Sequence, residues 1–151
     1  MLPPKGFLTL KQLAALVKND EIDTVLIAFT DLYGRLMGKR FDAAFFLECA
    51  ATHGTHCCDY LLTVDMEMTP VTGYRLANWE RGYGDFHMAP DLPTLRVASW
   101  LEKTALVICG LRHQNTEAPV DQAPRTILQT QVQAAAAGFE VLGASELEYY
   151  I

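Results

Sequence analysis

Residues 23–41 read DTVLIAFTDLYGRLMGKRF, and this stretch decides the fold. Apolar and β-branched side chains crowd residues 23–31, the triplet Leu32-Tyr33-Gly34 supplies a turn, and residues 35–41 form a second β-rich run. Two such runs on either side of a glycine turn are typical of a β-hairpin. The sequence therefore predicts a hairpin at this position.

The segments that flank the hairpin predict two helices. Thr9-Leu10-Lys11-Gln12 has the form of a capping box, and apolar residues follow it at helical spacing. Asp42 is placed to cap a second helix, over residues 42–53, that ends at Gly54. We expect this second helix to lie across the hairpin.

Further strands are expected over Tyr60–Val64, Thr94–Ala98 and Thr104–Leu111, the last one buried because residues 105–109 are continuously apolar. A hairpin, a helix and then more strands predict an α+β fold with a β-grasp layer. Residues 65–85 are broken by one proline and several glycines. A loop this long in a compact domain is uncommon unless it is functional, and a plain surface loop is the alternative.

The last third of the chain predicts a connection to a second domain. Residues 113–122 are polar, Pro124 is placed to begin a linking helix, and residues 145–151 alternate like a strand that then stops without a turn. The expected organisation is an amino-terminal helix over residues 1–22 and a β-grasp domain over 23–112. A linker and the truncated start of a catalytic domain follow over 113–151.

Composition argues against several classes of protein. The chain has 151 residues, is 50% hydrophobic and carries a formal net charge of −6, so it has no basic surface for nucleic acid. It contains no secretory signal and no apolar run long enough for a membrane span, so no membrane partner is expected. Four cysteines without a spaced framework favour a reducing cytoplasm. The group His53, His56, Cys57 and Cys58 lacks the second ligand pair of a zinc site.

Glu146 and Glu148 are the clearest candidates for metal binding. Side chains two residues apart on a strand share a face, so the two carboxylates would project together about 7 Å apart. Carboxylate oxygens suit Mg²⁺ or Mn²⁺, and two such ions can clamp a transferring phosphoryl group. The alternative is an amphipathic strand with one wet face, and the spacing alone does not decide between them. Phosphate-binding glycine loops and the Gly-x-Ser-x-Gly elbow are not found in the sequence.

Four segments, taken in order along the chain, resemble motifs of the glutamine synthetase family. They are Phe29–Lys39, Gly84–Asp91 with Thr94, Arg96 and Trp100, Pro124-Arg125 with Leu128, and Ser145–Tyr150. The first resembles the family's hairpin, the second its Gly-Asp and Pro-Asp signature, and the third the opening of its linking helix. The fourth is similar to the strand whose two glutamates bind paired metals.

The resemblance implies an ATP-dependent carbon–nitrogen ligase. Such an enzyme activates the glutamate side-chain carboxylate as an acyl phosphate, which ammonia or an amine then attacks. It also implies Glu146 and Glu148 as ligands of Mg²⁺ or Mn²⁺, Asp65 and Asp85 as catalytic acidic residues, and a ring-shaped homo-oligomer. The nucleotide site would lie outside this chain, so the chain alone is expected to be inactive.

Departures from the family pattern narrow this hypothesis. Ala123 and Ser99 stand where the family has aspartate and proline, and Val64-Asp65-Met66-Glu67 replaces the Asp-Gly-Ser-Ser of the glutamine-forming branch. The last difference resembles the branch that joins glutamate to larger amines. The competing hypothesis is a non-catalytic β-grasp interaction module or an inactive relative, which would keep the fold and need no metals.

Overall fold

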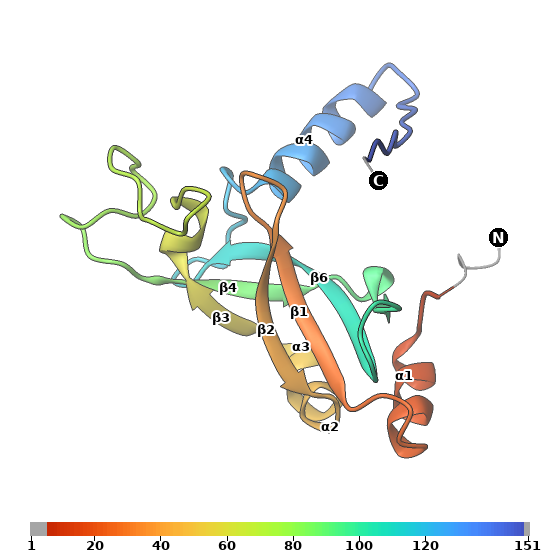
Figure 1. Cartoon of the computed structure of the whole chain (residues 1–151). Helices are drawn as coiled ribbons and strands as arrows, with labels where there is room; N and C mark the ends of the chain where they lie inside the picture. Colours follow the sequence, from red (N-terminus) through yellow and green to blue (C-terminus); the bar gives the residue numbers. More distant parts are fainter. Residues whose placement is uncertain (1–5, 150–151) are drawn as a thin grey trace.

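A mixed β-sheet forms the centre of the computed structural model, which describes residues 6–149 (Figure 1). Within these residues the strand order is β2-β1-β6-β4-β3, and a short strand, β5, pairs with β6. The strands are β1 Thr24–Thr30, β2 Leu36–Asp42, β3 Thr55–Cys58, β4 Asp85–Pro90, β5 Arg96–Val97 and β6 Thr104–His113. With its few helices, the chain is an α+β protein, as the sequence predicted.

The hairpin expected over residues 23–41 is confirmed. Strands β1 and β2 pair antiparallel from Thr24 opposite Asp42 to Thr30 opposite Leu36. On its other side β1 pairs parallel with β6, so the hairpin continues directly into the centre of the sheet. Gly34 closes the turn with a φ of +80°, a conformation that favours glycine.

Both helices expected in the first half are present. Helix α1, Leu10–Lys18, begins at Thr9 with the predicted capping box. Asp42 accepts a hydrogen bond from the backbone N–H of Phe45 at the start of the second helix. That helix runs through α2 Ala43–Phe45, a π-helical turn η1 Phe46–Ala50 and α3 Ala51–His53. Gly54 ends it with a φ of +66°.

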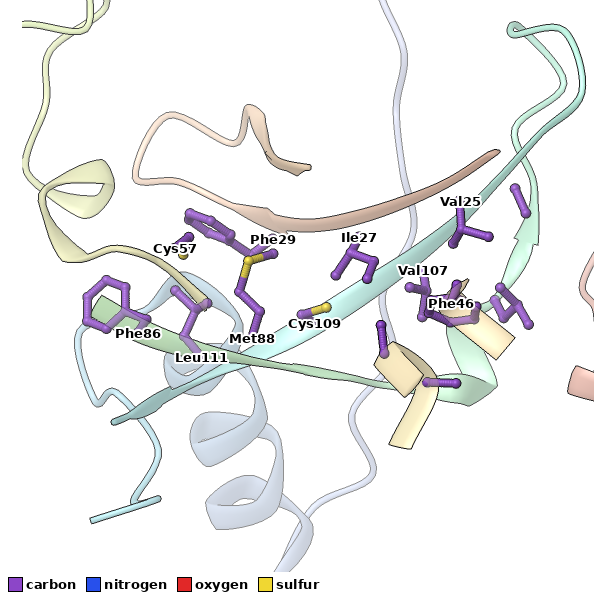
Figure 2. Close-up of a cluster of buried hydrophobic side chains, with 14 of the residues drawn as sticks. Val25, Ile27, Phe29, Phe46, Cys57, Phe86, Met88, Val107, Cys109 and Leu111 are labelled. Carbon is purple, nitrogen blue, oxygen red and sulfur yellow. The ribbon is translucent and has the colours of Figure 1, made fainter. Parts of the chain in front are cut away.

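The hydrophobic core lies between the sheet and this second helix (Figure 2). Alternate residues of β1, Val25, Ile27 and Phe29, point to this side and are buried with Phe46. The opposite side of the sheet carries a smaller buried cluster of Ala28, Ala98, Leu106 and Ile108. One face of the sheet is therefore well covered, and the other is covered mainly by short segments.

Two of the expected strands need correction. Residues 60–64 are not a strand, because the edge strand of the sheet is β3, Thr55–Cys58, and the chain then turns through the 3₁₀-helix η2, Asp59–Leu62. Residues 94–98 contribute only the two-residue β5, preceded by the 3₁₀-helix η3, Leu92–Thr94. The expected strand 104–111 is confirmed as β6 and extends to His113. Sequence analysis did not predict β4, whose residues it assigned only to a motif.

Beyond β6 the chain forms helix α4, Pro124–Ala136, which begins at the expected proline. Ala123 provides no side-chain cap, and Arg125 forms an ion pair with Asp91 at the end of β4. The strand predicted over residues 145–151 is wrong for 145–149, which are exposed and have no regular secondary structure. A strand needs a paired neighbour, and no described strand pairs with this segment. Residues 150–151 lie outside the described residues.

Residues 65–84 form the long excursion that the sequence predicted. They contain turns and two isolated bridges, Val64 with Pro70 and Asn78 with Gly82, but no helix or strand. No helix within residues 6–149 has both the length and the apolar character needed to cross a membrane.

Candidate functional site

A polar cleft of about 620 Å³ lies between the excursion 65–84 and the segment that follows β6. Its walls carry charges of both signs together with hydrogen-bonding groups, and they include Asp59, Arg75, Arg81, Asp85, His113 and Asp121. A cleft of this size with convergent polar groups is suited to a small charged molecule.

Asp59 and Asp85 lie at the floor of this cleft, where β3 ends and β4 begins. Cys58 pairs with Asp85 across the two strands, and the backbone N–H of Asp59 donates to the carbonyl of Gly84 at 2.9 Å. The sheet register therefore brings the two carboxylates together although 26 residues separate them in the sequence. Asp85 was predicted from its motif, whereas nothing in the local sequence pointed to Asp59.

The environment of Asp59 favours its protonated form. Burial raises the pKa of the Asp59 carboxyl above its ordinary value, and the nearby negative charge of Asp85 raises it further, while the backbone of Gly84 opposes the shift. The Oδ1 atom of Asp59 is buried and has no hydrogen-bond partner among the described residues. A buried acceptor without a partner carries a desolvation cost, which adds to the reasons why the charged form of Asp59 is disfavoured.

The basic side of the cleft comes from the excursion itself. Arg81 donates from Nη1 to the carbonyl of Arg75 at 2.7 Å, which ties two parts of the loop together. The side chain of Asn78 makes similar contacts, donating to the carbonyl of Tyr74 and accepting from the backbone N–H of Arg81. The loop is therefore organised by polar contacts within itself.

Asp65 does not line this cleft. Its Oδ1 atom accepts hydrogen bonds from the backbone N–H groups of Glu67, at 3.0 Å, and Thr69, at 2.9 Å. Its backbone carbonyl accepts a hydrogen bond from Arg35 at 3.0 Å. The structure thus places Asp65 in the first turn of the excursion and Asp85 at the first residue of β4, outside the excursion.

Glu146 and Glu148 are exposed and lie in the irregular segment after α4. Carboxylates are the donor type that Mg²⁺ and Mn²⁺ prefer, so the pair fits such ions by its chemistry. Residues 6–149 contain no group of three or more histidine, cysteine, aspartate or glutamate side chains arranged to hold a metal. A complete site would therefore need ligands other than those that the described residues bring together.

His87, in β4, connects three parts of the molecule. Its Nδ1 atom lies 2.8 Å from Oε2 of Glu117, and its Nε2 atom lies 2.9 Å from the carbonyl of His53. The ring also stacks on His56, with the ring centroids 5.3 Å apart. These contacts join β4 to the end of α3 and to the segment after β6, over sequence separations that no local pattern reveals.

Sequence comparison finds relatives that are named for amines. The chain is 45% identical over 150 residues to gamma-glutamylethanolamide synthetase of Streptomyces coelicolor. The alignment covers 99% of this chain and 32% of that protein. It is 35% identical over 136 residues to glutamate–isopropylamine ligase of a Pseudomonas species, and this alignment covers 89% of this chain and 29% of that protein. Human lengsin is 28% identical over 158 residues, covering 100% and 29%. The chain thus spans about a third of the length of these curated relatives, and no protein-family model matches it.

Solved structures share the fold. A structure described as the GmaS/ADP complex matches with a TM-score of 0.60 and 23% identity, covering 83% of this chain and 25% of that chain. A structure described as a novel glutamine synthase homologue matches with a TM-score of 0.63 and 16% identity, covering 77% and 27%. At these identities the matches are evidence for the fold alone.

The fold and the sequence matches first define a class: the chain is an α+β unit similar to part of ligases that are named for joining glutamate to an amine. More particularly, the resemblance to the glutamine synthetase family, predicted from four short motifs, is confirmed, and it lies with the amine-ligase branch.

Proposed function

We propose that this chain is the amino-terminal portion of an ATP-dependent ligase of the glutamine synthetase type. The complete enzyme joins the side-chain carboxylate of glutamate to an amine through an acyl phosphate. The observation that carries the proposal is the 45% identity, over 150 residues, to gamma-glutamylethanolamide synthetase. The second relative, also named for an amine, supports the same reaction type.

An organic amine is a better candidate than ammonia for the second substrate. One relative is named for an ethanolamide that it synthesises, and a second is named for isopropylamine, which it joins to glutamate. Where the glutamine-forming branch has Asp-Gly-Ser-Ser, this chain has Val64-Asp65-Met66-Glu67, with the Met66 side chain 56% exposed. An exposed thioether beside an acidic residue suits a substrate that combines an ammonium group with an alkyl substituent.

Two acidic residues, one in the excursion and one at the start of β4, act on this amine. At neutral pH the amine carries a proton, so a carboxylate attracts it, and the amine must then lose that proton before it attacks. Asp65 and Asp85 are the proposed catalytic residues. Asp85, at the start of β4, lines the polar cleft beside Asp59, and Asp65 lies at a turn of the excursion.

Glu146 and Glu148 would hold two divalent ions, Mg²⁺ or Mn²⁺, in the complete enzyme. Bound there, the ions would offset the negative charge on the oxygens of ATP and of the transferred phosphoryl group. The nucleotide site and the remaining metal ligands lie outside this chain, in the two thirds of the relatives that it does not cover.

The finer architecture follows from the same proposal. The sheet with its covering helix over residues 23–112 is the β-grasp domain, residues 1–22 are the amino-terminal segment that contains α1, and α4 is the linking helix. In a cytoplasmic ring-shaped homo-oligomer, the excursion 65–84 would complete the active site of a neighbouring subunit. The long excursion that extends from the sheet supports this arrangement (Figure 1).

The test is phosphate release by the full-length protein that carries this sequence, with ATP, Mg²⁺, glutamate and ethanolamine. We expect release that depends on both glutamate and the amine, with ammonia a poorer substrate than ethanolamine. The 151-residue chain alone should release none, and it serves as the control. A full-length protein without turnover would reject the ligase and favour the non-catalytic module. Turnover by the 151-residue chain alone would contradict the proposal that the nucleotide site and the remaining metal ligands lie outside this chain.

A further inference from the structure

Arg35 spans the gap between the β1–β2 hairpin and the excursion. Its Nη1 atom donates to the carbonyl of Met66 at 2.9 Å, and its Nη2 atom donates to the carbonyl of Asp65 at 3.0 Å. Thirty residues separate the two segments in the sequence, so the guanidinium connects parts of the chain that are distant along it. A planar guanidinium with several donors in fixed directions is suited to hold two neighbouring carbonyls at once.

Asp31 anchors this guanidinium. Its side chain is 2% exposed, and its Oδ2 atom accepts a hydrogen bond from Nε of Arg35 at 2.7 Å. Its other oxygen, Oδ1, accepts from the backbone N–H groups of Tyr33 and Arg35, which fixes the turn of the hairpin. A buried carboxylate with three donors is held in one orientation. Its ion pair with Arg35 therefore also fixes the direction of the Arg35 guanidinium.

The other end of the connection is a turn that Asp65 stabilises through its own side chain. Its Oδ1 atom caps the N–H groups of Glu67 and Thr69, and its backbone N–H donates to the carbonyl of Thr69 at 3.0 Å. Apart from these bonds within the turn, the contacts that tie residues 65 and 66 to the hairpin are those of Arg35. The position of the Asp65 carboxylate therefore depends on a residue that does not touch its oxygens.

We propose that Arg35 is a positioning residue: anchored by Asp31, it holds the backbone of the Asp65–Thr69 turn and so fixes where the Asp65 carboxylate meets the amine substrate. The catalytic part of this proposal rests on the function proposed above. Its structural part, the mechanical coupling of hairpin and turn, stands without that function. The two parts have separate experiments.

The structural experiment measures amide hydrogen exchange in the 151-residue chain. In Arg35→Met the amides of Glu67 and Thr69 should exchange about tenfold faster, because the turn loses its charge-assisted hydrogen bonds to the hairpin and keeps only its local hydrogen bonds. Amides of β6 such as Val107 should keep their rates. Arg40→Met is the matched control, since Arg40 is an exposed arginine of β2 that forms no ion pair or side-chain hydrogen bond within residues 6–149.

Asp31→Asn tests the coupling at a distance. Asparagine keeps an oxygen for the two backbone donors of the hairpin but loses the charge that orients Arg35. The Glu67 and Thr69 amides should therefore also exchange faster, although Asp31 does not contact them. The double variant Asp31→Asn/Arg35→Met should exchange no faster than Arg35→Met alone, because both changes break the same connection.

The functional experiment uses the full-length enzyme. Arg35→Met should raise KM for the amine about tenfold while leaving KM for ATP unchanged, and Arg35→Lys should recover part of the loss because it keeps the charge without the planar fork. Unchanged exchange at Glu67 and Thr69, or equally faster exchange throughout the sheet, would overturn the positioning role. Faster local exchange with unchanged amine KM would reject only the link to Asp65 chemistry.

Discussion

The sheet and the excursion over residues 65–84 are built from different interactions. The sheet is held by buried apolar side chains on β1, β4 and β6, among them Ile27, Met88 and Val107, each fully buried (Figure 2). The excursion is held by polar contacts, such as those that Arg35 and Arg81 donate to backbone carbonyls. Global stability therefore resides in the sheet, whereas the position of the Asp65 carboxylate depends on a few hydrogen bonds. Substitutions should separate the two properties.

The largest effect is expected from the core. Phe46→Ala removes a fully buried ring from the helix that covers the sheet, and should lower the free energy of unfolding by about 3–5 kcal/mol. Phe45 is 47% exposed and stacks on Phe41, so Phe45→Ala should cost no more than about 1.5 kcal/mol. Urea unfolding followed by circular dichroism measures both, and equal costs would contradict the assignment of Phe46 to the core.

Alkaline pH should also weaken the sheet. Burial raises the pKa of the Cys57 and Cys109 thiols from 9.0 to about 12, so the folded chain keeps protons that the unfolded chain loses above pH 9. Their contribution to stability is full below pH 9 and is lost as the pH rises toward 12. The denaturation midpoint should fall over this range, and less steeply in a Cys57→Ala/Cys109→Ala variant. At pH 8 both thiols should resist alkylation in the folded protein, unlike the half-buried Cys49 and Cys58.

A smaller effect is expected where the covering helix ends. A side chain at Gly54 would need a φ of +66°, and its Cβ would lie 2.4 Å from both the His87 ring and the carbonyl of Met88. Gly54→Ala should therefore cost about 1–3 kcal/mol. Gly73, in the excursion, also has a positive φ but has open space around it, so Gly73→Ala should cost only about 1 kcal/mol. Thermal unfolding of the two variants compares them, and an equal loss would show that the contact with His87 is unimportant.

The smallest effect on stability is expected in the excursion. Asp65→Asn keeps the oxygen that caps Glu67 and Thr69, so the free energy of unfolding should change by less than about 0.5 kcal/mol. Amine-dependent turnover by the full-length enzyme should nevertheless fall about a hundredfold, because the charge is lost. Lys11→Ala, at an exposed side chain of α1, is the control that should change neither. Normal turnover by Asp65→Asn would reject Asp65 as a catalytic residue.

Local patterns were sufficient to predict about half of the fold. The apolar run 25–29, the cap at Asp42 and the capping box at Thr9 each act through neighbours in the sequence, and each structure formed as expected. The pairing of β3 with β4 was missed because it joins Cys57 to Phe86 across the whole excursion. The alternation of residues 145–149 predicted a strand. A strand also needs a neighbouring strand with which its backbone can form hydrogen bonds, and alternation gives no information about that neighbour.

The candidate site was less predictable for the same reason. Motif resemblance located Asp85, and the structure added Asp59 only because the register of β3 and β4 places them together. The contacts of Arg35 with residues 65 and 66, and of His87 with Glu117, each span about thirty residues. Side chains that act across such distances carry no signal in their immediate neighbourhood, so the sequence alone could not assign them.

The position of β6 in the sheet has a consequence for how the chain folds. This strand pairs with β1, β4 and β5, yet it begins eighty residues after β1 begins. During synthesis the hairpin therefore emerges from the ribosome long before β6, the strand that it joins. Its apolar side chains stay exposed to solvent until residues 104–113 have been synthesised. Pairings between such distant segments form slowly, so we expect closure of the sheet around β6 to limit the folding rate. A nascent chain halted before residue 104 would expose the sheet's apolar surface to chaperones.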